Sequence, residues 1–251
     1  MSFNESALHL GTSGWAHRAW EGKLYPHDCH PRAYLTIYAE HFNTVEIEYT
    51  LYQIPTRKMV QSWYHRTPEG FIFCPCMPRQ ITHEKRLRNT QRQVENFLAI
   101  MLELDDKLGP ILLQLPEDFR HTEHEQLERF LDTLPAEQLF AIEFRHGSWL
   151  KETTFAQLEA LHIAWVVVDA PFMPRLPRVT ANFAYIRWHG YPGVAHQAKR
   201  QINPSAALSP WVPIIRQLQR QAAGVYGYVH NRFSGYAARD CQVLQGMLGD
   251  K

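Results

Sequence analysis

Side chains able to move protons occur in pairs two residues apart along this chain. The pairs are Glu46 with Glu48, Glu143 with Arg145, and Arg187 with His189. Side chains two apart on a β-strand face the same way, and an interior charge costs several kcal/mol unless it is paired or hydrated. The pairs therefore predict a shared polar pocket. Carboxylates whose pKa values are pushed apart in such a pocket could serve as a general acid and a general base.

Roles follow from residue type and position. Glu48 and Glu143 are the expected base and acid, and His189 is the expected proton-transfer group. We expect the remaining candidates to bind an anion or polarise an oxygen (Arg145, Arg187), to position substrate (Ser13, His83, Asp169, Asn231), or to form stacking walls (Trp15, Trp149). The alternative is that Glu143–Arg145 and Glu48–Arg187 are structural ion pairs.

Eight apolar-rich segments must position these residues. They are Leu8–Gly14, Phe42–Thr50, Phe71–Met77, Gly109–Leu115, Phe140–Arg145, Ala164–Asp169, Ala184–His189 and Val225–Asn231. Because their polar residues lie in the second halves, we expect the site at the carboxyl ends of parallel strands. The intervening Ile47, Phe144 and Trp188 should face the helices.

Helical patterns separate the segments and predict an α/β protein. The pattern from Thr90 to Leu108 stops at Gly109-Pro110. In the stretch 203–223, Pro210 and Pro213 favour a helix that starts near Trp211, and prolines break any helix in 170–183. Alternating strands and helices predict a single domain over residues 1–251, a TIM-type (β/α)8 barrel.

Composition excludes some functions and favours others. Lys and Arg total 26 against 25 Asp and Glu, so no overall charge attracts nucleic acid or acidic membranes. No stretch approaches the about 20 apolar residues that cross a bilayer, and the first ten residues lack a signal pattern. We expect a cytoplasmic protein with no membrane partner, and reduced thiols at its four cysteines.

The expected partner is a small polyhydroxylated or phosphorylated molecule, which the protein would hydrolyse or isomerise. The pattern assigns no metal ligand and names no cofactor, although the carboxylates with His189 and Asp169 could instead hold Mg²⁺ or Mn²⁺. The competing class is a non-catalytic protein that binds nucleic acid or another polyanion. It would use loop aromatics and the basic run that includes Arg86, Arg88 and Arg92.

Local motifs resemble the YecE-like family, the domain of unknown function numbered 72. The matching blocks run in family order from residue 10 to 245: Gly11-Thr-Ser-Gly-Trp15, Phe42-Asn-Thr-Val-Glu-Ile-Glu48, Ile81-Thr-His83, Lys107-Leu-Gly-Pro-Ile-Leu-Leu-Gln-Leu-Pro116, Glu143-Phe-Arg145, Tyr185-Ile-Arg-Trp-His-Gly190 and Asn231. The resemblance implies a TIM-barrel fold and brings no established reaction. Where the family usually has a lysine in its third strand, this chain has Cys76, so we assign position 76 no catalytic role.

Overall fold

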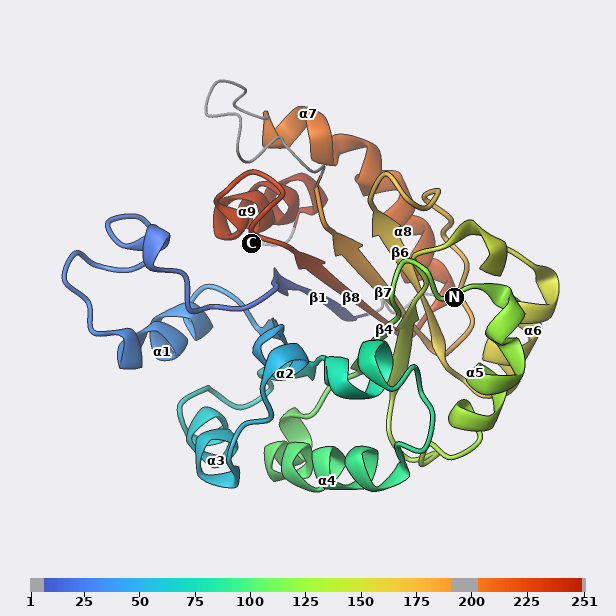
Figure 1. The fold of residues 1–251 in the computed structure, drawn as a ribbon. Helices are drawn as coiled ribbons and strands as arrows, with labels where there is room; N and C mark the ends of the chain where they lie inside the picture. Colours follow the sequence, from blue (N-terminus) through green and yellow to red (C-terminus); the bar gives the residue numbers. More distant parts are fainter. Residues whose placement is uncertain (1–6, 191–202, 250–251) are drawn as a thin grey trace.

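The structure is a computed structural model that describes residues 7–190 and 203–249. It has an α/β fold, as predicted, with parallel strands surrounded by helices (Figure 1). The strands are β1 (Ala7–Thr12), β2 (Thr44–Ile47), β3 (Ile72–Pro75), β4 (Ile111–Gln114), β5 (Phe140–Glu143), β6 (Ala164–Asp169), β7 (Phe183–Trp188) and β8 (Gly224–Val229). Each of the eight predicted segments overlaps one of these strands.

The strands pair as two parallel sheets. Six form one sheet in the order β1-β8-β7-β6-β5-β4, and β2 pairs with β3 in a second sheet. Isolated bridges join the two: Ser13 pairs with Glu46 on one side, and Phe73 with Leu108 and Cys76 with Leu112 on the other. A Cβ at Gly11 would collide with the carbonyl of Thr44, so β1 and β2 pass very close. The structure thus shows a six-stranded parallel half-barrel, and closure of all eight strands stays a prediction.

Helices follow most of the strands, as the hydrophobic patterns predicted. They are α1 (Tyr34–Ala39), α2 (Tyr49–Tyr52), α3 (Arg57–His65), α4 (Gln91–Met101), α5 (His124–Leu131), α6 (Glu152–Ala160), α7 (Pro204–Leu208), α8 (Val212–Gln221) and α9 (Ala237–Leu248). Shorter 3-10 or π segments are η1 (Arg18–Trp20), η2 (Pro31–Ala33), η3 (Gln80–Glu84), η4 (Leu102–Lys107), η5 (His121–Glu123), η6 (Gly147–Trp149) and η7 (Ser209–Trp211). None of the helices among the described residues is long and apolar enough to cross a membrane.

The helix expected to start near Trp211 is α8, which begins at Val212 as predicted. The short helix α7 precedes it, because the side chain of Asn203 accepts hydrogen bonds from the backbone of Ser205 and Ala206. One predicted boundary was wrong. The strand predicted over Phe42–Thr50 ends at Ile47 instead. Glu48 has helical backbone angles (φ −60°, ψ −27°) and begins α2, so it does not share the alternation of the strand before it.

Side chains on β5 and β7 alternate between the interior and the helix layer, as predicted. Phe144, just after β5, packs on Trp165 with ring centroids 5.3 Å apart, and Trp188 packs edge-on against Trp211, also at 5.3 Å. These apolar residues face away from Glu143 and Arg187, which are buried on the opposite face. The interior thus holds charges on one face of each strand while the helix layer receives the large apolar side chains.

A buried lysine completes helix α3. Lys107, at the end of η4, is 5% exposed. Its Nζ donates to the carbonyls of Tyr64 and Thr67, each at 2.7 Å, and to Thr67 Oγ1 at 3.1 Å. The last carbonyls of a helix lack partners within the helix and attract a positive charge. Lys107 therefore anchors the end of α3 to the segment that enters β4.

We predict that Lys107→Met, which keeps the chain length and removes the cation, lowers the free energy of unfolding by about 2–4 kcal/mol. Urea unfolding followed by circular dichroism measures this. Lys58→Met on the exposed side of α3 is the matched control and should change stability by less than about 0.5 kcal/mol. Equal midpoints for the two variants would refute the anchoring role.

Candidate functional site

Arg187 on β7 lies between two buried carboxylates. Its Nη2 donates to Glu46 Oε1 at 2.8 Å, and its Nη1 donates to Glu143 Oε2 at 2.5 Å. The three side chains are 3%, 0% and 0% exposed. Glu46 belongs to β2 and Glu143 to β5, so one guanidinium links the two sheets. Its fork is filled by these carboxylates and is therefore not open to a substrate anion, contrary to the expectation from sequence.

The other carboxylate oxygens also have partners. Ser13 Oγ donates to Glu46 Oε1 at 2.6 Å, and the Tyr185 hydroxyl donates to Glu46 Oε2 at 2.8 Å. Gln114 Nε2 donates to Glu143 Oε1 at 3.1 Å. Ser13 thus holds a carboxylate in place. Sequence reasoning missed Tyr185, although it lies two residues before Arg187 and so shares its face of β7.

His189 contacts the same cluster. Its Nε2 lies 2.9 Å from Glu143 Oε2. Burial alone would raise the pKa of Glu143, but the charge of Arg187 and the hydrogen bonds with His189 and Arg187 hold it far below its ordinary value. The lowered pKa favours the ionised form of Glu143, whereas the general acid expected from sequence would need the protonated form. Burial lowers the pKa of His189, so its neutral form is favoured.

Glu48 reaches this cluster through a histidine that sequence reasoning missed. Its Oε1 lies 3.0 Å from His230 Nε2, and His230 Nδ1 accepts a hydrogen bond from the backbone of Arg232. The rings of His230 and His189 are stacked with centroids 6.2 Å apart. Glu143, Arg187 and His189 are thus in direct contact, and Glu48 joins them indirectly. The Glu48–Arg187 ion pair of the alternative interpretation does not form, since Arg187 pairs with Glu46.

Arg145 and His83 lie at the edge of the cluster. Arg145 pairs with Glu117 at 2.7 Å and only loosely with Glu143 at 3.8 Å, and its guanidinium lies 4.6 Å from the centre of the Phe172 ring. The side chain of Arg145 is 23% exposed, so it remains accessible to an anion. Burial, followed by the charges of Arg79 and Arg145, lowers the pKa of His83 to about 4. His83 is therefore neutral at pH 7.

Three predicted site residues have structural contacts instead. Trp149 is buried, stacked on Phe119, and its indole N–H donates to the Phe119 carbonyl, so it offers no stacking wall. The amide oxygen of Asn231 accepts hydrogen bonds from the Trp20 indole and from the backbone of Ala237 at the start of α9. Asp169 is held by Arg175 at 2.8 Å. Trp15 is half-buried and lies beside Glu48 in a separate pocket, described below.

No group of three His, Cys, Asp or Glu side chains that could hold a metal ion occurs in residues 7–190 and 203–249. Cys76 is 1% exposed. Burial raises the pKa of its thiol, and the neighbouring charge of Glu46 raises it further. The position that the family usually gives to lysine therefore carries an uncharged side chain close to the carboxylates.

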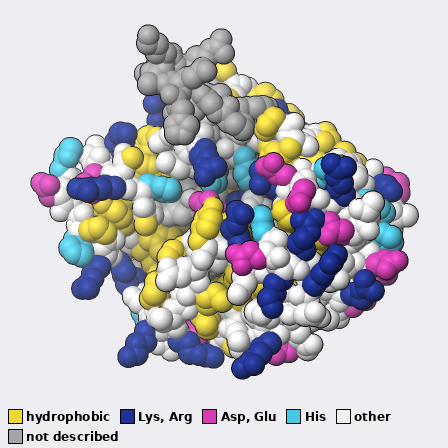
Figure 2. Space-filling view, viewed as in Figure 1, with side chains coloured by type: hydrophobic (Ala, Val, Ile, Leu, Met, Phe, Trp, Pro, Cys, Tyr) yellow, Lys and Arg dark blue, Asp and Glu magenta, His cyan; other side chains and the backbone are white. Residues whose placement is uncertain are grey.

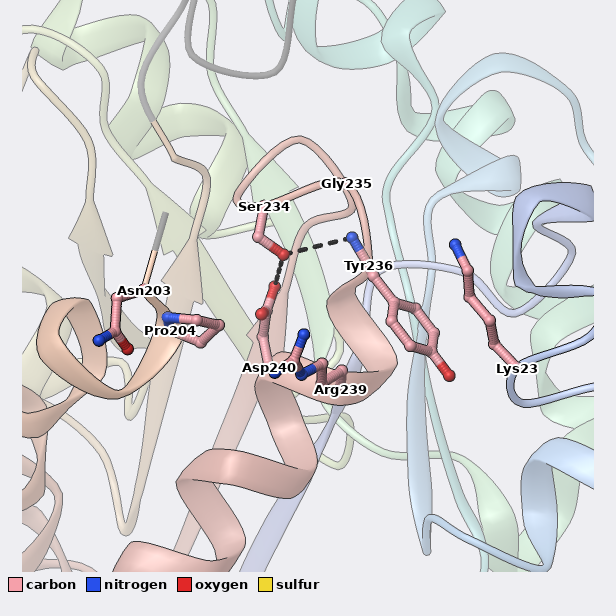
Figure 3. Close-up of a pocket in the computed structure, with 8 residues that line it drawn as sticks. All are labelled: Lys23, Asn203, Pro204, Ser234, Gly235, Tyr236, Arg239 and Asp240. Carbon is pink, nitrogen blue, oxygen red and sulfur yellow. Dashed lines mark hydrogen bonds between the residues drawn. The ribbon is translucent and has the colours of Figure 1, made fainter. Parts of the chain in front are cut away.

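A larger cavity of about 810 Å³ lies apart from this cluster, between the start of α7 and the start of α9 (Figure 3). Lys23, Arg239 and Asp240 are among the residues that line it. Ser234 Oγ donates to Asp240 Oδ2 at 2.5 Å, while Oδ1 has no hydrogen-bond partner within the part of the chain that the structure describes. Burial raises the pKa of Asp240 from its ordinary 3.8 to about 6.

We predict that Glu143→Gln lowers the free energy of unfolding by about 3–5 kcal/mol at neutral pH, because Arg187 and His189 lose their shared partner. The folded-state pKa of Glu143 lies below its ordinary value of 4.5, so its stabilising charge is present above pH 4.5 and is lost as pH falls. The difference from the parent protein should narrow below pH 4.5 in chemical unfolding curves. Glu117→Gln, at a carboxylate that is 68% exposed, is the control. A parent-like Glu143→Gln variant would contradict the pairing.

Asp240 should make stability depend on pH in the opposite direction to Glu143. Its folded-state pKa of about 6 exceeds its ordinary 3.8, so folding takes up a proton and stability falls as pH rises from about 4 to about 6. Asp240→Asn should therefore be about 1–3 kcal/mol more stable than the parent at pH 8 and nearly equal to it at pH 4. Thermal melting at both pH values tests this, with the exposed Asp132→Asn as control. A gain that does not depend on pH would contradict the raised pKa.

Comparisons with known proteins place the chain in a family. Residues 9–251 match the family described as "Protein of unknown function DUF72". The UPF0759 protein YecE of Escherichia coli K12 is 35% identical over 139 residues, a match that spans 55% of this chain and about half (48%) of YecE. The UPF0759 protein YunF of Bacillus subtilis is 24% identical, over 96% of this chain and 94% of YunF.

Solved structures agree. The crystal structure of a DUF72 family protein from Thermotoga maritima has a TM-score of 0.83 and 28% identity, covering 97% of this chain and 99% of that one. A DUF72 family protein from Enterococcus faecalis shares the fold, with a TM-score of 0.79, 22% identity, and coverage of 97% and 98%. On the match over residues 9–251, this chain belongs to the DUF72 family.

Proposed function

We propose that this protein is an enzyme in which His189 transfers a proton to or from a small polyhydroxylated or phosphorylated substrate, in a hydrolysis or an isomerisation. The observation that carries the proposal is the 2.9 Å contact between His189 Nε2 and the ionised Glu143. A carboxylate on one ring nitrogen orients the imidazole and stabilises its protonated form. The Nδ1 atom, which has no hydrogen-bond partner in residues 7–190 and 203–249, is then free to act on a substrate.

The neighbouring side chains fit subsidiary roles. Glu143 is a positioning residue in this proposal, because its strongly lowered pKa keeps it charged. Glu48 is 24% exposed, so it is a carboxylate that a substrate can reach. Arg145, 23% exposed at the edge of the cluster, is the candidate that binds a phosphate or polarises an oxygen.

The strand arrangement is compatible with the closed barrel expected from sequence. We infer one domain in which the half-barrel and the β2–β3 pair close into a (β/α)8 barrel, with the cluster at the carboxyl ends of the strands. The bridges at Ser13–Glu46 and Cys76–Leu112, on the two sides of the β2–β3 pair, support closure. A cytoplasmic location is part of the same inference and rests on the sequence.

The alternative, a protein that binds nucleic acid or another polyanion without chemistry, has weaker support. Arg86, in the basic run that would contact phosphates, is already paired with Asp118 at 2.9 Å and with Glu123 at 2.5 Å. Figure 2 shows basic and acidic side chains interspersed on the right half of the face it presents, so no patch of one sign is visible there. Polyanion binding depends on an accumulation of unpaired positive charge.

We expect His189→Asn to slow turnover by about 100-fold or more, the usual contribution of a general acid or base. The assay incubates the parent protein with sugar phosphates and polyols and follows products by ¹H and ³¹P nuclear magnetic resonance. His162→Asn is the matched control: His162 is exposed, and asparagine tolerates its positive φ of 54°.

The parent rate should fall as the pH drops below the lowered pKa of His189, because protonation removes the base. Turnover that survives His189→Asn would overturn the role of His189. A folded parent that converts none of these compounds would overturn the substrate class.

A further inference from the structure

An apolar pocket of about 200 Å³ lies beside Glu48, between the segment that follows β1 and helices α2 and α3. Its aromatic walls are Trp15, Trp63 and Tyr49, and Met59 closes one side. The indoles of Trp15 and Trp63 stand almost perpendicular, with an interplanar angle of 83° and centroids 5.5 Å apart. The edge of one indole therefore packs against the other, and both rings line the pocket.

The pocket opens on an exposed apolar surface. Tyr49 is 40% exposed and Met59 38%, whereas Trp63 is only 7% exposed and forms the floor. Figure 2 shows hydrophobic side chains gathered on the left of the face it presents. At about 200 Å³ the pocket is smaller than the roughly 300–1,000 Å³ of sites for whole drug-sized ligands. It fits a head group of a few heavy atoms.

Glu48 carries the only carboxylate among the described residues that line the pocket. Burial works to raise its pKa, but the hydrogen bond with His230 and the charges of His230, Arg187 and Arg232 bring it below its ordinary value. The carboxylate is therefore ionised at neutral pH. Hydroxyl groups placed against the apolar walls, away from the carboxylate, would have no hydrogen-bond partners.

Counted over the Glu and Arg side chains alone, the charge next to the pocket is negative, and Glu48 has only the His230 imidazole, 3.0 Å away, as a direct partner. Glu46 and Glu143 share the single guanidinium of Arg187, and Arg145 is paired mainly with Glu117. Arg232 approaches Glu48 but is exposed, so water screens its charge. An apolar cation would satisfy the excess negative charge and the aromatic faces together.

We propose that this pocket binds a methylated ammonium group, held by cation–π contacts with Trp15, Trp63 and Tyr49 and by the charge of Glu48. Clustered aromatic rings recognise quaternary ammonium ions through cation–π contacts, and a nearby carboxylate adds charge attraction. The proposal concerns binding alone and goes beyond proton transfer at His189. Either can fail while the other holds.

The test compares choline with 3,3-dimethylbutan-1-ol, which has the same shape but carries carbon in place of the charged nitrogen. Isothermal titration calorimetry of the full-length protein at constant ionic strength should show choline binding about 2- to 30-fold more tightly, the range that a cation–π contact supplies. Trp15→Leu, which keeps an apolar wall without a π face, should abolish most of this preference. Glu48→Gln should reduce it.

Tyr52→Leu is the matched control, because Tyr52 is 64% exposed and lies outside the residues that line the pocket. Thermal melting verifies that each variant is folded. Equal affinity for choline and its neutral isostere, or no binding of choline by the folded parent at millimolar concentration, would overturn the proposal. A preference for choline that survives Trp15→Leu would place the cation elsewhere and would also overturn it. Neither result bears on turnover by His189.

Discussion

The shared guanidinium of Arg187 is the interaction on which the interior of this protein depends. It joins Glu46 of the two-stranded sheet to Glu143 of the six-stranded sheet, and all three side chains are removed from water. Burying such charges costs several kcal/mol each unless every polar atom has a partner. Ser13, Tyr185 and Gln114 supply partners for the carboxylates, while Arg187 Nε has no hydrogen-bond partner among the described residues. Residues from five different strands or their ends thus converge on one ion triad, which fixes how the sheets face each other.

The same triad accounts for how far the site could be predicted from sequence. Alternation along a strand correctly placed Glu143, Arg187 and His189 together, because β5 and β7 remain extended up to these residues. It failed at Glu48, because β2 ends at Ile47 and Glu48 already has the helical backbone angles that lead into α2. The sequence also could not predict which glutamate pairs with Arg187. Glu46 and Glu48 were both candidates, and Glu46 is the partner because β2 ends at Ile47.

Other errors have equally local causes. Trp149 and Asn231 were expected at the site because of their positions near strand ends, but an indole N–H or an amide in a loop is often needed to satisfy backbone groups. His230 follows β8 directly, and its link to Glu48 depends on a pairing across 182 residues that no local pattern reveals. The strands and most helices were predictable because periodicity and proline positions are local. Their pairing into two sheets was not, since it depends on contacts distant in sequence.

The pairing of the first strand with the last also has a consequence for biosynthesis. Each residue of β1 from Ala7 to Thr12 is matched with a residue of β8 from Gly224 to Val229. Ribosomes add about 5–20 residues per second, so the nascent β1 waits roughly 10–40 s for its neighbour in the sheet. During that interval its hydrogen-bonding groups form an unpaired edge that other chains can join. The ribosome-bound intermediate, rather than the finished protein, is therefore the species that most needs a chaperone.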